Sequence, residues 1–169
     1  QKTLPDLQGN IRYQSGNNSI MFMYSYDTSL ASSSQVLPIE DQSSLTSIIT
    51  GNPDLNPNKA HNFNVMLGNF DRKTRQGFNA NLAYTYNESS IVNSVITNET
   101  DLTRKVTYEN IKGNYRLQGN VNFNKQYQKG LNKFRVNVGL MASYALNQGF
   151  NQSEKYEAFN TTVAPNIRL

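Results

Sequence analysis

Along most of the chain, apolar and polar residues alternate with a period of two, which is the pattern of a β-strand with two different faces. Between Phe78 and Asn87, every second residue is apolar or aromatic, and most of the intervening residues are polar. Helical spacing fits none of these stretches. The same alternation predicts further strands around residues 20–26, 63–67, 114–124, 134–146 and 159–163, and a first strand ending near Ile11 and Tyr13.

The longer runs hold about ten residues, which is the length that a tilted strand needs to cross a bilayer. Asparagine is a poor strand former, so its repeated use on one face indicates a surface that must stay wet, such as a barrel lumen. We therefore predict an all-β fold: an antiparallel transmembrane β-barrel segment of about six or seven meander strands of a larger barrel. The residues expected to face lipid are Phe78, Leu82, Tyr84, Leu117, Val121, Phe123, Val136, Val138 and Leu140.

The connections between these strands alternate between short and long. Outer-membrane barrels have short periplasmic turns and longer external loops. Between Tyr108 and Tyr115 the apolar phase shifts, which predicts either a bulge at Gly113 or a strand that continues above the membrane. The short connections are expected near 14–18, 72–76 and 128–132, and the long ones over 31–61, 89–109 and 150–157.

The composition alone resembles that of a soluble or partly disordered chain, but it does not exclude a barrel. Only 37% of the residues are hydrophobic and the mean hydropathy is -0.63, yet 11% are aromatic, which argues against disorder. No window is apolar enough for a transmembrane helix. A barrel strand is half polar, so low hydropathy does not exclude it. Since there is no cysteine and one histidine, disulfides and thiol chemistry are excluded and a zinc site is not expected.

The net charge of +4 is polarised along the strand axis. Basic residues gather at the short turns, whereas acidic residues lie mainly in the predicted long connections. Nucleic-acid binding requires a basic stripe on one surface, and basic turns dispersed along the chain do not supply one. The basic residues at the short-turn end are Arg12, Arg72, Lys73, Arg75, Lys125, Lys129, Lys133 and Arg135.

One segment resembles a known family. Residues 51–57 read Gly-Asn-Pro-Asp-Leu-Asn-Pro and precede the alternating stretch 61–68. This resembles the signature with which the barrels of TonB-dependent receptors close an external loop and start a descending strand. The likeness is greatest to Bacteroidetes-type outer-membrane β-barrels, although Asn56 and Asn58 replace the Lys and Glu that are usual there.

The resemblance implies a bacterial outer-membrane location and a transporter, powered by TonB through a plug domain, that takes up a bulky nutrient. Residues 1–169 then form part of one barrel domain with no plug, and the absence of a signal peptide suggests an internal piece of a longer precursor. The implied partners are outer-membrane lipid, the rest of the barrel and the plug, TonB through the plug, and a surface lipoprotein. The motif loop of Gly51, Asn52, Pro53, Asp54, Leu55 and Pro57 is either a ligand contact or a turn that starts a strand.

Few other residues are candidates for chemistry. Asp27, Arg116, Asn120 and Asn122 lie on polar strand faces and are possible lumen contacts for a solute, or a generic wet lining. His61 has no metal-ligand partner at suitable spacing. We find no catalytic, cofactor-binding or metal-binding pattern and expect no cofactor and no enzyme activity. The tyrosines, such as Tyr24, suit an interfacial girdle.

Two alternatives to the transporter remain. The barrel could be a structural subunit of an outer-membrane assembly that moves nothing itself. It could also be a soluble lipocalin-type barrel, which would place its apolar residues inside and its polar residues outside. A plug and a TonB-contacting segment upstream would distinguish the first alternative from transport, and the direction of the apolar faces would test the second.

Overall fold

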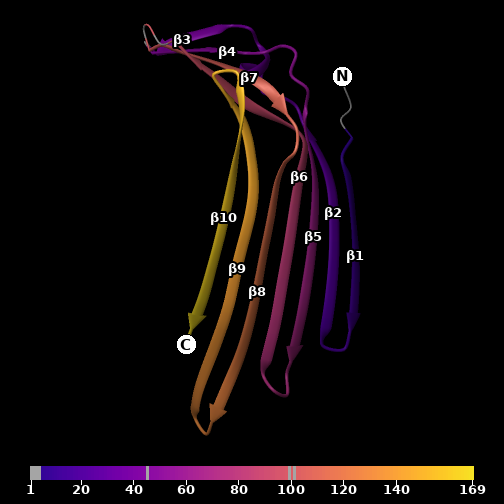
Figure 1. The fold of residues 1–169 in the computed structure, drawn as a ribbon. Coiled ribbons are helices and arrows are strands. Elements are labelled where there is room, and N and C mark those ends of the chain that lie inside the picture. Colours follow the sequence, from indigo (N-terminus) through magenta and orange to yellow (C-terminus); the bar gives the residue numbers. More distant parts are fainter. Residues whose placement is uncertain (1–4, 45, 99, 101) are drawn as a thin grey trace.

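The computed structural model describes residues 5–44, 46–98, 100 and 102–169. In this part of the chain, the backbone forms ten strands and one short helix (Figure 1). The elements are β1 (Leu7–Ser15), β2 (Asn18–Ser29), α1 (Ser33–Val36), β3 (Glu40–Ser44), β4 (Ser47–Thr50), β5 (Asn58–Asp71), β6 (Gln76–Thr97), β7 (Arg104–Ile111), β8 (Asn114–Lys129), β9 (Asn132–Asn151) and β10 (Glu154–Arg168). Among these residues, no helix has the length and apolarity to cross a membrane.

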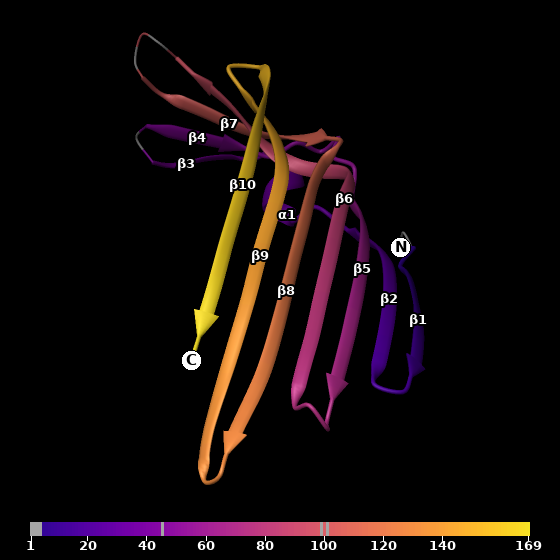
Figure 2. The same ribbon diagram turned by 60° about the horizontal axis from the view of Figure 1, so that its bottom comes forward.

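Seven strands form a continuous antiparallel meander in the order β1-β2-β5-β6-β8-β9-β10 (Figure 1). Every predicted alternating stretch lies in one of them, so the expected transmembrane β-barrel segment of six or seven meander strands is confirmed. The three short turns also lie together at one end of the sheet (Figure 2). Two of them use glycine at positive φ, Gly16 at 54° and Gly130 at 60°, where residues with a Cβ are strained.

The predicted long connections are only partly correct. The connection after β2 spans residues 30–57 rather than 31–61, and it contains α1, β3 and β4. Residues 89–109 are not a loop, because β6 and β7 continue through most of them as a paired hairpin. Residues 150–157 are not a loop either: β9 and β10 pair up to Asn151 and Glu154, and the turn is Gln152–Ser153. Both turn residues have positive φ, which is the geometry of a tight two-residue hairpin turn.

The phase shift near Gly113 marks the point where a strand leaves the membrane region. Pairing of β6 passes from Asn114 of β8 to Ile111 of β7 without a change of register, so there is no bulge on that ladder. Gly113 has φ of 92° and its amide donates to the Asn87 carbonyl at 3.0 Å. The register shift lies instead on the other side of β6, between Lys59 and Ala60 of β5. The fold therefore has no bulge at Gly113, and β6 continues past this point to Thr97.

The external parts of the chain extend the same sheet beyond the meander, and we call this part the cap. It consists of α1, β3, β4, β7 and residues 90–97 of β6. Strand β4 pairs in parallel with β7, and Ser94 and Val95 of β6 pair in parallel with Phe150 and Asn151 of β9. These pairings bend the cap away from the strand direction toward the β9–β10 side of the sheet (Figures 1 and 2).

The two faces of the meander differ in the way expected of a curved sheet. Apolar side chains such as Leu82 and Leu140 are exposed, whereas the asparagines of the opposite face are mostly half-buried. The polar face is also crowded, because a Cβ on Gly139 would lie 2.4 Å from Asn122 Oδ1. Side chains converge on a concave face and diverge on a convex one. The polar face is therefore the inner wall and the apolar face is the outer one.

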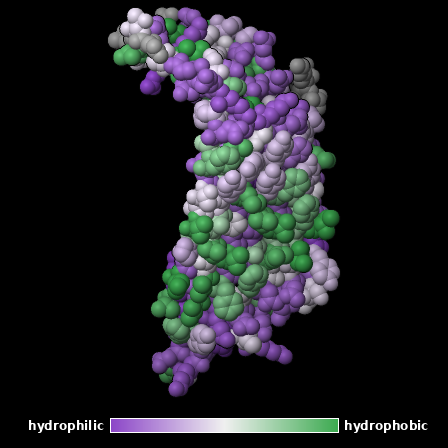
Figure 3. Space-filling model, in the orientation of Figure 1, coloured by the Kyte–Doolittle hydropathy of each residue, from purple (hydrophilic) through white to green (hydrophobic). Residues whose placement is uncertain are grey.

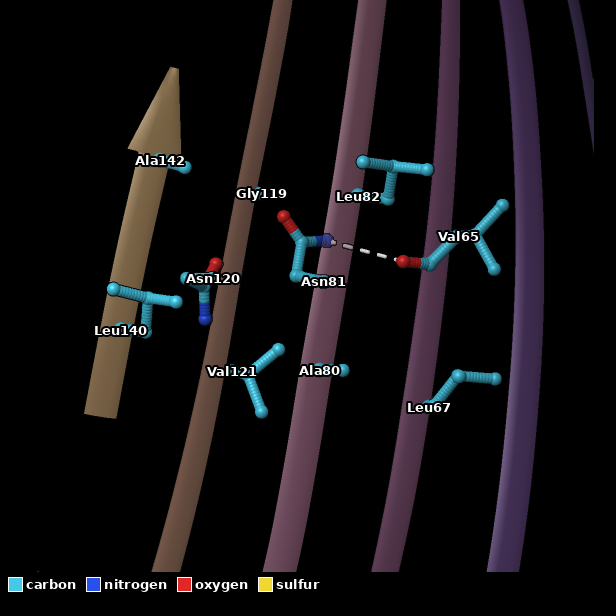
Figure 4. Close-up of a pocket in the computed structure, with 10 residues that line it drawn as sticks. All are labelled: Val65, Leu67, Ala80, Asn81, Leu82, Gly119, Asn120, Val121, Leu140 and Ala142. Atoms are coloured by element: carbon cyan, nitrogen blue, oxygen red, sulfur yellow. Dashed lines mark hydrogen bonds between the residues drawn. The ribbon is translucent and has the colours of Figure 1, made fainter. Parts of the chain in front are cut away.

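The apolar outer face forms a band between polar ends (Figure 3). Ala80, Gly119 and Ala142 form the floor of a shallow groove of about 350 Å³ within it, between larger side chains such as Leu82 and Leu140 (Figure 4). The small residues lie next to one another because the cross-strand register joins Leu82 to Gly119 and Gly119 to Ala142. This surface has the composition of a lipid-facing barrel wall.

An aromatic row marks the external limit of this band. It crosses six neighbouring strands, with ring centroids 5.0–6.3 Å apart, through Tyr24, Phe63, Tyr84, Tyr115, Tyr144 and Phe159. Near the short turns, Tyr127 and Phe134 form a second contact at 5.9 Å. Phe134 and Tyr144 are ten residues apart on β9. That is about 33 Å along the strand, or about 25 Å of membrane depth at a tilt of about 40°, which matches the apolar band of outer-membrane barrels.

Candidate functional site

The inner wall carries rows of polar side chains that run across the strands. Alternation places these residues on one face, and the register brings them together. In a row near the external end, Asn62 Nδ2 donates to Asp27 Oδ2 at 2.6 Å and Thr85 Oγ1 donates to Asn62 Oδ1 at 2.8 Å. Thr85 lies opposite Arg116 on β8. This row therefore has a carboxylate at one end and a guanidinium at the other.

Nearer the short turns, amides recur on the inner wall beside apolar residues such as Met66 and Met141. Asn81 Nδ2 donates to Asn64 Oδ1 at 3.0 Å, and Asn120 lies opposite Asn81. One step nearer the short turns, Asn122 Nδ2 donates to Asn79 Oδ1 at 3.3 Å. Each amide offers both donors and an acceptor, and one partner does not use them all. The wall can therefore hydrogen-bond an uncharged polar solute without imposing a net charge on it.

All four residues proposed from sequence as lumen contacts lie on this inner wall, but they are not one cluster. Asn120 and Asn122 are successive inner-face residues of β8. Arg116 lies on the same strand, two inner-face positions nearer the external end than Asn120. Asp27 is three strands away, on β2. The residues that connect them, Asn62, Thr85, Asn64 and Asn81, were not singled out. Alternation put them on the polar face, but only the cross-strand register shows which of them meet.

The motif loop, which connects β4 to β5, packs against the cap. Gly51 is buried, and a Cβ added there would lie 2.1 Å from the Leu37 carbonyl oxygen and 3.0 Å from that of Gln35. Asn52 N donates to the Gln35 carbonyl at 2.7 Å, and its side-chain Nδ2 donates to the Tyr108 carbonyl at 2.8 Å. Glycine is thus required by close backbone approach, and asparagine connects the loop to β7.

The rest of the motif forms a turn around Asn52. Asp54 N donates to Asn52 Oδ1 at 3.0 Å, which is an Asx turn. Pro53 and Asp54 are exposed, whereas Leu55 and Pro57 are half-buried. The exposed part that a ligand could reach is therefore small, and the buried part makes contacts within the cap.

Asn110 of β7 completes the attachment. Its Oδ1 accepts the Asn56 amide at 2.7 Å, and its Nδ2 donates to the Asn56 carbonyl at 2.9 Å and to Ser89 Oγ at 3.1 Å. One side chain thus pairs with both backbone groups of Asn56, as a neighbouring strand would.

Asn110→Ala should loosen this attachment, because it removes both hydrogen bonds to the Asn56 backbone. Asn56 is exposed, so water can replace the lost partner, and each bond contributes about 0.5–1.5 kcal/mol net. We expect faster amide hydrogen exchange at residues 52–58 and unchanged exchange in β8 and β9. Asn93→Ala is the matched control, since Asn93 is an exposed asparagine of the same cap. Equal protection in the two variants would show that Asn110 does not hold the loop.

His61 lies on the outer face at the external end of β5. Tyr24 Oη is 3.0 Å from His61 Nδ1, and Glu88 Oε2 is 3.7 Å from its Nε2. Lys59 Nζ lies 3.4 Å from Glu88 Oε1. Within the described residues, no three His, Cys, Asp or Glu side chains gather as a metal site would require. This cluster belongs to the aromatic row, where polar side-chain ends meet the headgroup zone.

Comparison with known proteins gives one match. The family model described as "Outer membrane protein beta-barrel family" matches residues 5–169, which is nearly the whole chain. No curated protein and no solved structure gives a significant match.

Proposed function

Because the chain belongs to this outer membrane β-barrel family, we propose that it forms part of the barrel of a TonB-dependent transporter that takes up a bulky nutrient across a bacterial outer membrane. The observation that carries the proposal is the inner wall of cross-strand amide rows, which lies next to a structured external cap. Such a wall suits the passage of a polar solute, and a cap attached by side-chain hydrogen bonds suits its capture.

The open sheet edges support a larger barrel. Within the described residues, β1 pairs with β2 alone and β10 with β9 alone, so the first and last strands do not close on each other. Unpaired backbone groups in hydrocarbon cost several kcal/mol each. Both edges are therefore paired with further barrel strands or with a second copy. A plug outside these residues, TonB acting through it, and a surface lipoprotein are the other partners of the proposed transporter.

The arrangement of the faces is the reverse of a lipocalin-type barrel, because the apolar side chains point outward and the amides inward. A barrel subunit that transports nothing would have the same two faces. Transport must therefore be tested by its energy dependence and not by the fold.

Uptake in whole cells distinguishes the two. Cells with the gene should accumulate bulky labelled oligosaccharides or peptides, and deletion of the gene or addition of a protonophore should abolish this. Asn64→Ala with Asn81→Ala should lower apparent affinity by about tenfold, since two hydrogen bonds of about 0.5–1.5 kcal/mol to the solute are lost. Leu67→Ala on the outer face is the control. Uptake equal in cells with and without the gene would reject transport and favour a structural subunit.

A further inference from the structure

A cavity of about 720 Å³ lies on the inner wall at the short-turn end, which is the periplasmic side of an outer-membrane barrel. Four cationic residues line it: Arg72 and Arg75 from the β5–β6 turn, and Lys133 and Arg135 from the start of β9. We call them the basic mouth. They come from two hairpins that the register brings together, since the Gln126 amide donates to the Arg75 carbonyl at 3.0 Å.

The residues opposite these cations are neutral. Gln128 pairs with Lys133, and Gln126 pairs with Arg135, at positions where a glutamate would form a cross-strand ion pair. Arg75 Nη1 donates to Gln128 Oε1, which supplies a hydrogen bond but no counter-charge. Of the described residues that line the cavity, none is acidic. The positive charge of the basic mouth is therefore not neutralised by its own wall.

Asp71 is the nearest acidic residue in the sequence, and it is engaged by its own turn. Its Oδ2 accepts a hydrogen bond from Thr74 Oγ1 and its Oδ1 accepts one from the Lys73 amide, both at 2.8 Å. These bonds, the Thr74 one foremost, lower the pKa of Asp71 below its usual value. Asp71 also occupies an outer-face position at the end of β5, opposite Gln76, whereas its neighbour Phe70 lines the cavity.

The same end of the sheet also carries lysines on its outer face, and their surroundings differ from those of the basic mouth. Lys125 and Lys129 alternate with the inward glutamines of β8, and Lys125 Nζ lies 5.2 Å from the Tyr127 ring centroid. Such side chains can extend to lipid headgroups. The basic mouth faces the lumen, where no lipid is available, so its counter-charge must come from the lumen or the periplasm.

We propose that the basic mouth is a docking site for an acidic peptide segment that reaches the barrel from the periplasmic side. A single small anion could not contact all four cations, which come from two hairpins around a cavity of about 720 Å³. A peptide places several carboxylates at spacings that can meet cations on two hairpins. Its backbone also suits the amides that line the cavity, such as Asn124 and Asn137. The proposal holds for a transporting and for a structural barrel alike.

Site-directed cross-linking in intact cells tests this. Gln126 lines the cavity, and it is replaced by the photo-reactive residue benzoylphenylalanine in the full-length protein. After irradiation, the cross-linked segment is identified by mass spectrometry. We expect a peptide segment with at least two Asp or Glu near the cross-link. In isolated outer membranes, the yield should fall by about fivefold or more in 0.5 M salt, where the Debye length is on the order of 4 Å.

Charge variants provide the second readout. The pairs Arg72→Gln with Arg75→Gln and Lys133→Gln with Arg135→Gln should each reduce the yield severalfold, whereas the outer-face pair Lys125→Gln with Lys129→Gln should leave it unchanged. If a variant does not fold, the salt dependence of the otherwise unchanged protein decides. A cross-link to lipid, to a neutral or basic segment or to nothing, or a yield insensitive to salt, would overturn the proposal.

Discussion

Leu140→Arg should destabilise the folded barrel by about 2–4 kcal/mol, because it places a charge near the middle of the lipid-facing band. Leu140 lies on β9 between the two aromatic limits, and 46% of its surface is exposed on the outer face. The arginine head would have to extend along the wall to a headgroup region or remain in hydrocarbon. Reversible unfolding by denaturant in phospholipid vesicles measures this free energy.

Met141→Arg is the matched control. Met141 is the next residue of the same strand, is also apolar, and is 39% exposed, but it faces the inner wall opposite Asn120. There the new charge meets water and amides, so the cost should be within about 0.5 kcal/mol. Leu140 and Met141 lie on the same strand, are both apolar and have similar exposure. The difference in free energy of unfolding between the two variants therefore depends only on which face of the sheet carries the arginine. Equal free energies of unfolding would contradict the assignment of inner and outer faces.

Gly51→Ala should open the cap at a local cost of about 3 kcal/mol or more. The added Cβ would lie 2.1 Å from the Leu37 carbonyl oxygen, and backbone atoms on both sides leave no flexible side chain to move away. Overpacking of this kind usually costs about 1–3 kcal/mol, and contact with fixed backbone is its severe form. The strands of the meander should keep their stability, because the cap lies outside the apolar band.

Hydrogen exchange and protease sensitivity measure this effect separately for cap and barrel. Exchange at residues 33–50 should accelerate by about 100-fold, as a local opening free energy lower by about 3 kcal/mol implies. Gly9→Ala on β1 is the control, since a Cβ there meets no atom within 4 Å. Unchanged protection of the cap in Gly51→Ala would show that the motif glycine is not needed for close approach.

The barrel strands could be predicted because their pattern depends on local chemistry. An apolar residue such as Leu82 is favoured where the strand faces lipid, and a polar residue such as Asn81 is favoured where it faces water. Because side chains alternate between the two faces, this preference repeats at every second position. The short turns could likewise be predicted from their glycine and polar residues. The strands of the cap could not be predicted from the sequence. Residues 90–97 and 104–109 are rich in polar side chains, and they form strands because they pair with each other and because β4 and β9 supply further partners at their edges.

The turn at Gln152–Ser153 shows the same limit on a smaller scale. Neither residue favours the positive φ that both adopt, so the sequence suggested a loop. The turn is held because Gln152 makes two side-chain hydrogen bonds with the Thr97 backbone, both at 3.2 Å, across 55 positions of the chain. These hydrogen bonds to a distant residue offset the unfavourable φ angles of the turn. The residues next to the turn in the sequence give no sign of them.

The sequence by itself determined which residues lie on the apolar face, where the three short turns are, and that the strands belong to a barrel wall, because side-chain transfer between an apolar medium and water acts on each residue separately. Only the tertiary structure decided which asparagines meet in rows, that Gly51 supports a cap, and that Arg75 and Arg135 line one cavity. These features depend on cross-strand register and on backbone pairing between distant segments, and neither is encoded in the period of a single strand.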